Sequence, residues 1–232
     1  MRAGIMQPYF FPYLGYFQLI GALDLFIVHD NVKYTKKGWI NRNRILRDGS
    51  DAVITVPLKS ASDALDIRDR EVASDFRRDK LLNTIRECYR RAPCFAQAYP
   101  LIDRVVRYAE PNLFDFLYHS IVETCRYLGL ATPMPRSSEY GLDAALRGQD
   151  RVIALCKAAG ASAYVNPIGG IELYSKEAFR ANGLELRFLR SCAFPYPQFG
   201  DTFVPSLSII DVIMFNPVEV VRARIDTGYE LL

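Results

Sequence analysis

The sequence predicts an α/β fold built on a mostly parallel, Rossmann-like sheet. A short strand within 3–8 enters a loop with two prolines, a helix follows over 13–20, and an apolar strand covers 25–28. This strand–loop–helix–strand order is how a parallel sheet begins. With 232 residues, 50% of them hydrophobic and 24% charged, the chain can bury a core without disulfides or metals.

The middle of the chain changes from strand patterns to helix patterns. The expected elements are a strand over 52–57, a helix capped by Ser74 that reaches Tyr89, a helical stretch over 101–108 after Pro100, and a helix over 114–128. In each of these helices the apolar residues recur at helical spacing and so lie along one face. We therefore predict a single domain over 1–232, with a helical insertion at about 74–130.

The second half returns to alternating helices and strands, as a continued parallel sheet requires. In order, we expect a helix over 151–159, a strand over 162–165, a turn over 166–170, a helix over 171–181, a strand over 184–189 and an apolar helix over 206–215 that begins with Ser206 as its cap.

Charge and cysteine content exclude several classes of protein. The net charge is only +3, so general attraction to nucleic acid is weak. No apolar window approaches the roughly 20 residues of a membrane span, and the first residues lack the pattern of a signal peptide. The five cysteines form no CxxC pair, which argues against a disulfide framework or a zinc site. We expect a cytoplasmic protein with no membrane span and no metal.

Polar side chains follow the first two predicted strands. Gln7, Tyr9 and Tyr13 follow the first strand, and His29 and Asp30 follow the second. Ligand sites in open α/β sheets lie beyond the carboxyl ends of the strands. His29 and Asp30 are therefore the candidate catalytic residues, as a general base with its orienting acid, although neighbours on a strand point to opposite faces and need not touch. The other three are candidate substrate ligands.

A basic run follows immediately, because six Lys and Arg residues occur between 33 and 47 without one Asp or Glu. Its candidate substrate-binding residues are Lys36, Trp39, Asn41, Arg42, Asn43 and Arg44. Arginine forks match phosphate oxygens, and tryptophan offers a surface on which a base or sugar can stack. If this segment is extended, the two asparagines share one face and the two arginines the other. The competing interpretation is a solvated basic strand or loop.

Three further candidate substrate ligands lie near the C-terminus. Gln198 belongs to an aromatic, proline-containing loop, and Ser208 and Asp211 share one face of the last predicted helix. The competing interpretation of the second pair is a helix cap. An aspartate in so apolar a helix needs a partner if it is buried, and we expect Arg42 or Arg44 to be that partner.

Several of these segments together resemble the WbqC-like family. The segments that carry the resemblance are 6–17 (MQPYFFPYLGYF), 30–34 (DNVKY), 39–45 (WINRNRI), 196–198 (YPQ) and 207–211 (LSIID). They are spread over most of the chain, and the N-terminal motif is specific.

The resemblance implies a step in O-antigen or other surface-polysaccharide biosynthesis that acts on an activated sugar. We expect a transferase that moves an acyl or aminoacyl group onto the amine of a nucleotide-linked sugar and forms an amide. In such an enzyme the basic run would hold the diphosphate, and Gln7 and Gln198 would orient the substrate. The attacking amine must lose a proton, which would be the task of His29 or Asp30.

Two other interpretations stay open. The segment 12–16 is similar to the loop and helix start of nucleotidylyl transferases of the HxGH class, with tyrosines where histidines would bind phosphate. Alternatively, a non-catalytic protein could hold a glycan or carrier intermediate on the aromatic and basic surface. The donor can be an acyl carrier or an aminoacyl-tRNA, and we expect no other nucleic-acid partner. No Walker or GxGxxG motif points to a cofactor.

Overall fold

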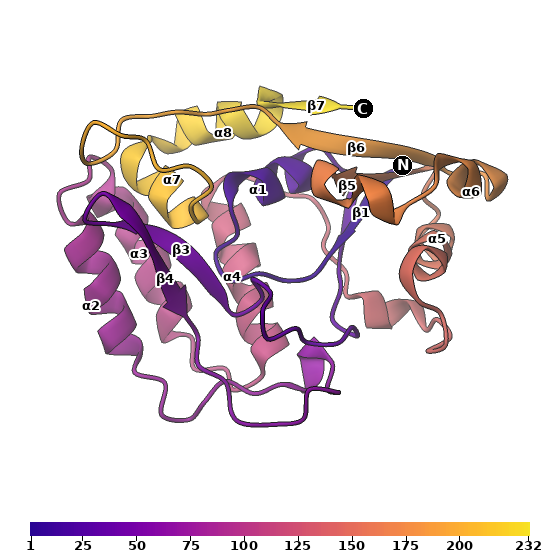
Figure 1. The fold of residues 1–232 in the computed structure, drawn as a ribbon, viewed down its shortest axis with the longest axis horizontal. Coiled ribbons are helices and arrows are strands. Elements are labelled where there is room, and N and C mark those ends of the chain that lie inside the picture. The colour runs from indigo at the N-terminus through magenta and orange to yellow at the C-terminus, as the bar shows by residue number, and fades with distance from the viewer.

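Two β-sheets organise the computed structural model, which describes residues 1–232 (Figure 1). The strands are β1 (Arg2–Met6), β2 (Leu25–Val28), β3 (Arg42–Arg47), β4 (Ser50–Thr55), β5 (Ala163–Pro167), β6 (Glu185–Ser191) and β7 (Tyr229–Leu231). The main sheet has the order β2-β1-β5-β6-β7, in which only β7 runs antiparallel to its neighbour, and β3 pairs with β4 as a hairpin. The predicted fold class, α/β with a mostly parallel sheet, is confirmed.

Helices cover both faces of the main sheet. They are α1 (Leu14–Gly21), α2 (Arg78–Tyr89), α3 (Phe95–Arg107), α4 (Leu113–Tyr127), α5 (Gly148–Ala158), α6 (Lys176–Ala181), α7 (Ile209–Phe215) and α8 (Val218–Thr227). Short 3-10 turns occur at Ile67–Asp69, Ser137–Tyr140 and Ile168–Leu173. None of the helices combines the length and the apolar character that crossing a lipid bilayer requires.

The apolar side chains divide into two cores. The larger core holds 47 buried residues and joins α1, the hairpin, the helices of the middle segment and α7. The smaller core holds 11 buried residues and lies between the sheet and the helices α5 and α6. Alternation along β2 separates the two, because Phe26 and Val28 point into the larger core and Ile27 into the smaller one. In Figure 1 the hairpin and α2 lie to the left of the sheet and α5 and α6 to the right.

Two helix boundaries in the middle segment differ from the prediction. α2 begins at Arg78 rather than after Ser74, and the side chain of its N-cap residue, Arg77, makes no capping hydrogen bond. Pro100 lies inside α3 instead of preceding a new helix. The proline is on the solvent side of α3, where the carbonyl that loses its hydrogen bond can be hydrated, so the helix continues through it.

The C-terminal half shows three further differences. The helix expected over 171–181 is broken, because Ser175 caps a separate helix, α6, by accepting a hydrogen bond from the Ala178 amide. Ser208, not Ser206, caps α7, and its hydroxyl accepts from the Ile210 amide. Ser206 has a φ of +57°, outside the extended region that an N-cap residue adopts. The helix α8 and the edge strand β7 were not predicted.

Candidate functional site

A cleft of about 690 Å³ opens beside the carboxyl ends of β1 and β2. His29, which follows β2, lies in its wall together with the turn at Ser137–Tyr140 and the start of α5. The cationic side chains that line it are Lys33, Arg68, Arg147 and Arg151. Asp66 is the single carboxylate among the lining residues. The cleft is therefore built to receive an anion, and its position is the usual one for a ligand in an open α/β sheet.

His29 is neutral in this cleft. Burial and the nearby charge of Arg151 lower the pKa of His29 to about 4, and the opposing effect of Asp30 is smaller. Its Nδ1 lies 2.8 Å from the hydroxyl oxygen of Ser137, and no residue of the chain hydrogen-bonds to its Nε2. An uncharged imidazole with one free nitrogen can accept a proton from a substrate.

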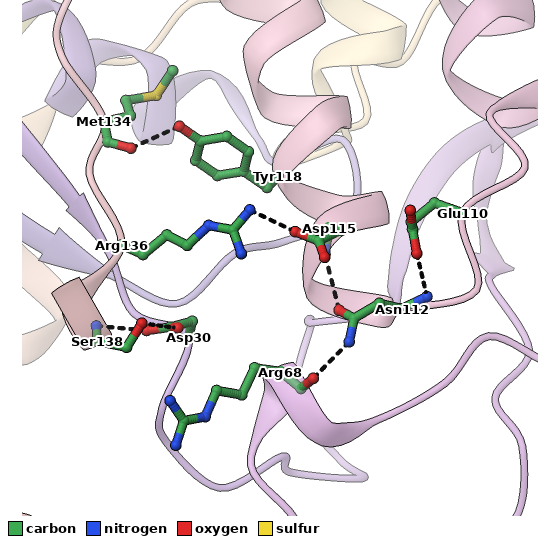
Figure 2. A network of polar contacts seen from close by, with 9 residues as sticks. All are labelled: Asp30, Arg68, Glu110, Asn112, Asp115, Tyr118, Met134, Arg136 and Ser138. Carbon is green, nitrogen blue, oxygen red and sulfur yellow. Dashed lines mark hydrogen bonds and ion pairs between the residues drawn. The ribbon is translucent and has the colours of Figure 1, made fainter.

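Asp30, the next residue in the chain after His29, is almost completely buried. Its carboxylate accepts hydrogen bonds from the Ser137 hydroxyl at 2.8 Å, from the Ser138 amide at 3.0 Å and from the Ser138 hydroxyl at 2.6 Å (Figure 2 shows the contacts with Ser138). Burial raises the pKa of Asp30, but the hydrogen bonds from the two serines outweigh it, so the net shift is downward. Asp30 therefore stays ionised and holds this turn in place.

Ser137 connects the two predicted catalytic residues, which do not touch each other directly. Its one hydroxyl hydrogen faces three acceptors, on His29, Asp30 and Asn31. A carboxylate is the strongest acceptor of the three, so we assign the hydrogen to Asp30. His29 Nδ1 then carries its own hydrogen and donates to Ser137. This assignment leaves the lone pair on Nε2, the nitrogen that has no partner within the chain.

Arg151 is the second unusual residue of the cleft. It is 8% exposed, and its guanidinium meets only the carbonyls of Asn31 at 3.3 Å and Leu146 at 3.5 Å. Its Nε has no partner, and no carboxylate forms an ion pair with it. A buried cation without a counter-ion is costly unless a ligand supplies the negative charge.

A polar network supports the wall of the cleft from the side of α4 (Figure 2). Arg136 pairs with Asp115 at 2.7 Å, and the Asp115 amide donates to the Asn112 side chain at 3.1 Å. Asn112 in turn donates to the carbonyl of Arg68 at 2.6 Å. The backbone of Arg68 is thus fixed, while its guanidinium has no partner in the chain and lines the cleft.

The loop after β1 is held in place by two of the predicted ligands. Asn43 donates to the carbonyls of Phe10 at 3.0 Å and Phe11 at 2.7 Å, and Ser208 donates to the carbonyl of Phe11 at 2.7 Å. Phe11 has a φ of +42°, a conformation that aromatic residues rarely adopt. Both Asn43 and Ser208 are buried, so the structure places them as supports of this loop.

The three predicted ligands of that loop do not line the cleft. Gln7 accepts a hydrogen bond through its carbonyl from the Tyr16 hydroxyl at 2.9 Å, and the Tyr9 ring packs against Tyr16. Burial raises the pKa of Tyr9 and of Tyr13. Tyr13 and Tyr196 line a separate aromatic pocket of about 300 Å³ that has no charged side chain.

The strand β3 presents two different faces, as expected. Asn41 and Asn43 point inward and are buried, while Arg42 and Arg44 are more exposed. The Asn41 side chain accepts from the Tyr34 hydroxyl at 2.8 Å and donates at 2.7 Å to the carbonyl of Val56, the residue that follows β4. Its hydrogen bonds therefore tie the hairpin to the preceding loop.

The outward face of the hairpin forms a platform. The guanidinium groups of Arg42 and Arg44 lie 5.6 and 5.4 Å from the ring centre of Trp39, which is exposed. Lys36, nearby in sequence, forms an exposed ion pair with Asp63 at 2.8 Å. None of these residues lines the cleft around His29. The predicted site residues therefore do not form a single site.

The prediction that Arg42 or Arg44 pairs with Asp211 is wrong. Asp211 is fully buried, but Arg42 bonds to the Gly38 carbonyl and Arg44 pairs with Asp51. The donors to the Asp211 carboxylate are the Tyr89 hydroxyl at 2.8 Å, the Tyr196 hydroxyl at 2.6 Å and the Gln198 amide at 2.6 Å. Arg42 and Arg44 lie on the outward face of β3 and do not reach the buried carboxylate, so three neutral donors bind it in place of a cation.

Sequence reasoning missed the residues that complete the cleft. They are Arg68, Ser137, Arg147 and Arg151. A usable signal for Arg151 was its position directly before the apolar run 152–156 of a predicted helix. Ser137 offered none, because its contact with His29 joins residues 108 positions apart.

Comparison with known proteins agrees with the motif evidence. No three His, Cys, Asp or Glu side chains gather into a set of metal ligands. The profile of the WbqC-like protein family matches residues 7–223. Uncharacterized protein Rv1507c of Mycobacterium tuberculosis (strain ATCC 25618 / H37Rv) is 27% identical over 218 residues, which are 93% of each chain. The chain belongs to the WbqC-like protein family.

Proposed function

We propose that this protein is a transferase that forms an amide on a nucleotide-linked amino sugar, with the sugar nucleotide bound in the cleft at His29. The observation that carries the proposal is the pairing of a neutral, oriented histidine with a cationic cleft. The pathway that the family resemblance implies is O-antigen or other surface-polysaccharide biosynthesis, which we include in the proposal.

His29 supplies the base that this reaction needs. The amine nitrogen attacks the carbonyl carbon of an acyl or aminoacyl donor, and the bond from that carbon to the carrier oxygen or sulfur breaks. His29 Nε2 takes the proton that the amine loses and passes it to the leaving group. Asp30 orients the imidazole through Ser137, as its hydrogen bonds support.

The cations of the cleft suit a diphosphate. Arg151 is buried without a counter-ion, and Arg68 and Arg147 are exposed at the same cleft. A bound diphosphate would offset the charge of Arg151, which is one cause of the low pKa of His29. Substrate binding would therefore make His29 a stronger base. The volume of about 690 Å³ lies within the usual range for small-molecule sites, roughly 300–1,000 Å³.

The resemblance to the HxGH class does not carry a competing proposal. The Tyr16 hydroxyl, at the place of the second histidine, is buried and bonded to the Gln7 carbonyl. The pocket beside Tyr13 has no cation that could bind phosphate. The helix start after the proline loop therefore lacks the groups that nucleotidyl transfer needs.

A titration with UDP-, dTDP- and GDP-sugars tests the proposal, with thermal stability as the readout. A bound sugar nucleotide at one hundred times its dissociation constant should stabilise the protein by about 2.7 kcal/mol. The double variant Arg68→Gln/Arg147→Gln should lose that stabilisation. The matched control Arg42→Gln/Arg44→Gln removes the same charge from the platform and should keep it.

Loss of stabilisation in Arg42→Gln/Arg44→Gln but not in Arg68→Gln/Arg147→Gln would indicate that the sugar nucleotide binds at the platform of Trp39. No stabilisation by any of these compounds would contradict the proposal and favour a binding protein for a glycan or carrier intermediate.

A further inference from the structure

A second concave surface lies beside α2, far from His29 in the fold. We call it the α2 groove, and it has a volume of about 1,010 Å³. Its walls are α2, the hairpin turn at Arg47 and the loop residue Phe199, and it shares no lining residue with the cleft. In Figure 1 this region lies at the left, whereas α5, which borders the cleft, lies at the right.

The α2 groove follows the length of a helix. Lys80, Thr84 and Glu87 line it at intervals of three or four residues, so they form one stripe along α2, and Arg91 lines the groove two residues after the helix ends. The 12 residues of α2 span about 18 Å at 1.5 Å per residue. A groove of this length exceeds what one diphosphate would occupy and suits an extended chain.

Cations dominate the groove. They are Arg47, Arg77, Arg78, Lys80, Arg91 and Arg107. The three carboxylates in it already have partners: Asp48 pairs with Arg47 at 3.6 Å, Asp79 with Arg107 at 3.0 Å, and Glu87 with Arg90 at 3.6 Å. The cations that have no carboxylate partner are Arg77, Arg78, Lys80 and Arg91.

A guanidinium group packed against an aromatic ring lies at each end of this charged surface. The Arg78 guanidinium lies 4.9 Å from the ring centre of Phe76, and the Arg91 guanidinium lies 5.4 Å from that of Phe199. The Phe76 ring is buried and the Phe199 ring is half-buried, so the two guanidinium groups are the main flat surfaces on which unpaired bases can stack. Only 4 of the 16 lining residues are hydrophobic, whereas a docked protein helix needs an apolar centre.

We propose that the α2 groove binds the phosphodiester backbone of a single-stranded RNA segment, such as the 3′ end of a tRNA. The length of the groove, its cations without a carboxylate partner and the guanidinium groups packed on rings at its two ends carry this inference. That the RNA is the aminoacyl donor of the transfer rests on the proposed function, but binding of RNA itself does not.

Fluorescence anisotropy with labelled, deacylated tRNA tests the inference between about 50 and 200 mM salt. Contact of the unpaired cations with three or four phosphates predicts a slope of about −2 to −3 in a plot of log affinity against log salt. Arg77→Gln/Lys80→Gln should make the slope shallower by about 1.4 and weaken binding roughly tenfold. Arg42→Gln/Arg44→Gln, which removes the same charge elsewhere, should change neither.

Equal weakening by both double variants, or no binding of tRNA to the unaltered protein, would overturn the inference. Binding of a purified acidic acyl carrier protein in place of tRNA, lost in Arg77→Gln/Lys80→Gln, would also overturn it. The sugar-nucleotide titration should be unchanged in that variant, and His29→Gln should bind tRNA normally. Failure of RNA binding is therefore distinguishable from failure of the proposed function.

Discussion

Asp30 and Asp211 are two buried aspartates that accept the same number of hydrogen bonds and have opposite pKa shifts. Each carboxylate accepts three. Burial raises the pKa of both, but the hydrogen bonds of Ser138 and Ser137 outweigh it at Asp30. At Asp211 burial outweighs the tyrosine and amide donors, so its pKa is raised.

The two regions also differ in where their hydrogen bonds lead. From Asp30 the chain of contacts runs through Ser137 to His29, which borders an open cleft. From Asp211 one branch runs through Tyr89 to the buried Leu46 amide, and another runs to Tyr196, which lines the aromatic pocket. The two carboxylates therefore differ in the group that each network reaches, which is an imidazole in a cationic cleft for Asp30 and a phenol in a pocket without charged side chains for Asp211.

The largest expected effect comes from removing the base of the cleft. His29→Gln should lower the rate of amide formation about 10²–10⁴-fold, because the amine would lose its proton acceptor. Ser137→Ala should cause a smaller loss, because it removes only the link to Asp30. The measurement is the steady-state rate with a nucleotide-linked amino sugar that stabilises the unaltered protein. Equal rates for His29→Gln and the unaltered protein would contradict the role of this histidine.

The next effect concerns stability in acid. The folded chain disfavours the protonated form of His29, because the pKa of this residue is lowered to about 4. Between pH 6.5 and about 4 the unfolded chain therefore binds more protons than the folded chain. The free energy of unfolding falls as the pH falls through that range. The two pKa values correspond to a loss of about 3 kcal/mol, which His29→Gln should not show.

Denaturant unfolding at several pH values measures this difference. The raised pKa of Asp211 acts with the opposite sign, but it is present in both proteins and cancels in the comparison. Identical pH profiles for the unaltered protein and His29→Gln would show that His29 is not held in the neutral form.

The smallest of the three effects tests the core region. Asp211→Asn should destabilise the fold by about 2 kcal/mol, because its NH₂ group would face a buried donor. The exposed control Asp201→Asn should change stability by less than about 0.5 kcal/mol. Sugar-nucleotide binding should survive in both variants. Its loss in Asp211→Asn alone would mean that the aromatic pocket near Tyr196 belongs to the ligand site.

Secondary structure could be predicted from the sequence wherever the apolar and polar residues of a segment recur with a regular period. The strand over 25–28, the third helix of the middle segment and the opposite faces of Asn43 and Arg44 all follow from the spacing of apolar and polar residues. Helix ends were less predictable. Ser175 interrupts an apolar helical pattern, because its capping bond competes locally with a continuous helix.

The fold class, the family and the position of His29 and Asp30 at the end of a strand all follow from the sequence. The residues that surround these two side chains depend on how distant segments pack. Arg151 lies 120 positions from its contact at Asn31, and Ser137 lies 107 positions from Asp30. Periodicity carries information over a few turns of helix or strand, whereas a cleft is assembled by packing between distant elements. That is why the cations of the cleft, and the separation of the Trp39 platform from it, became visible only in the folded chain.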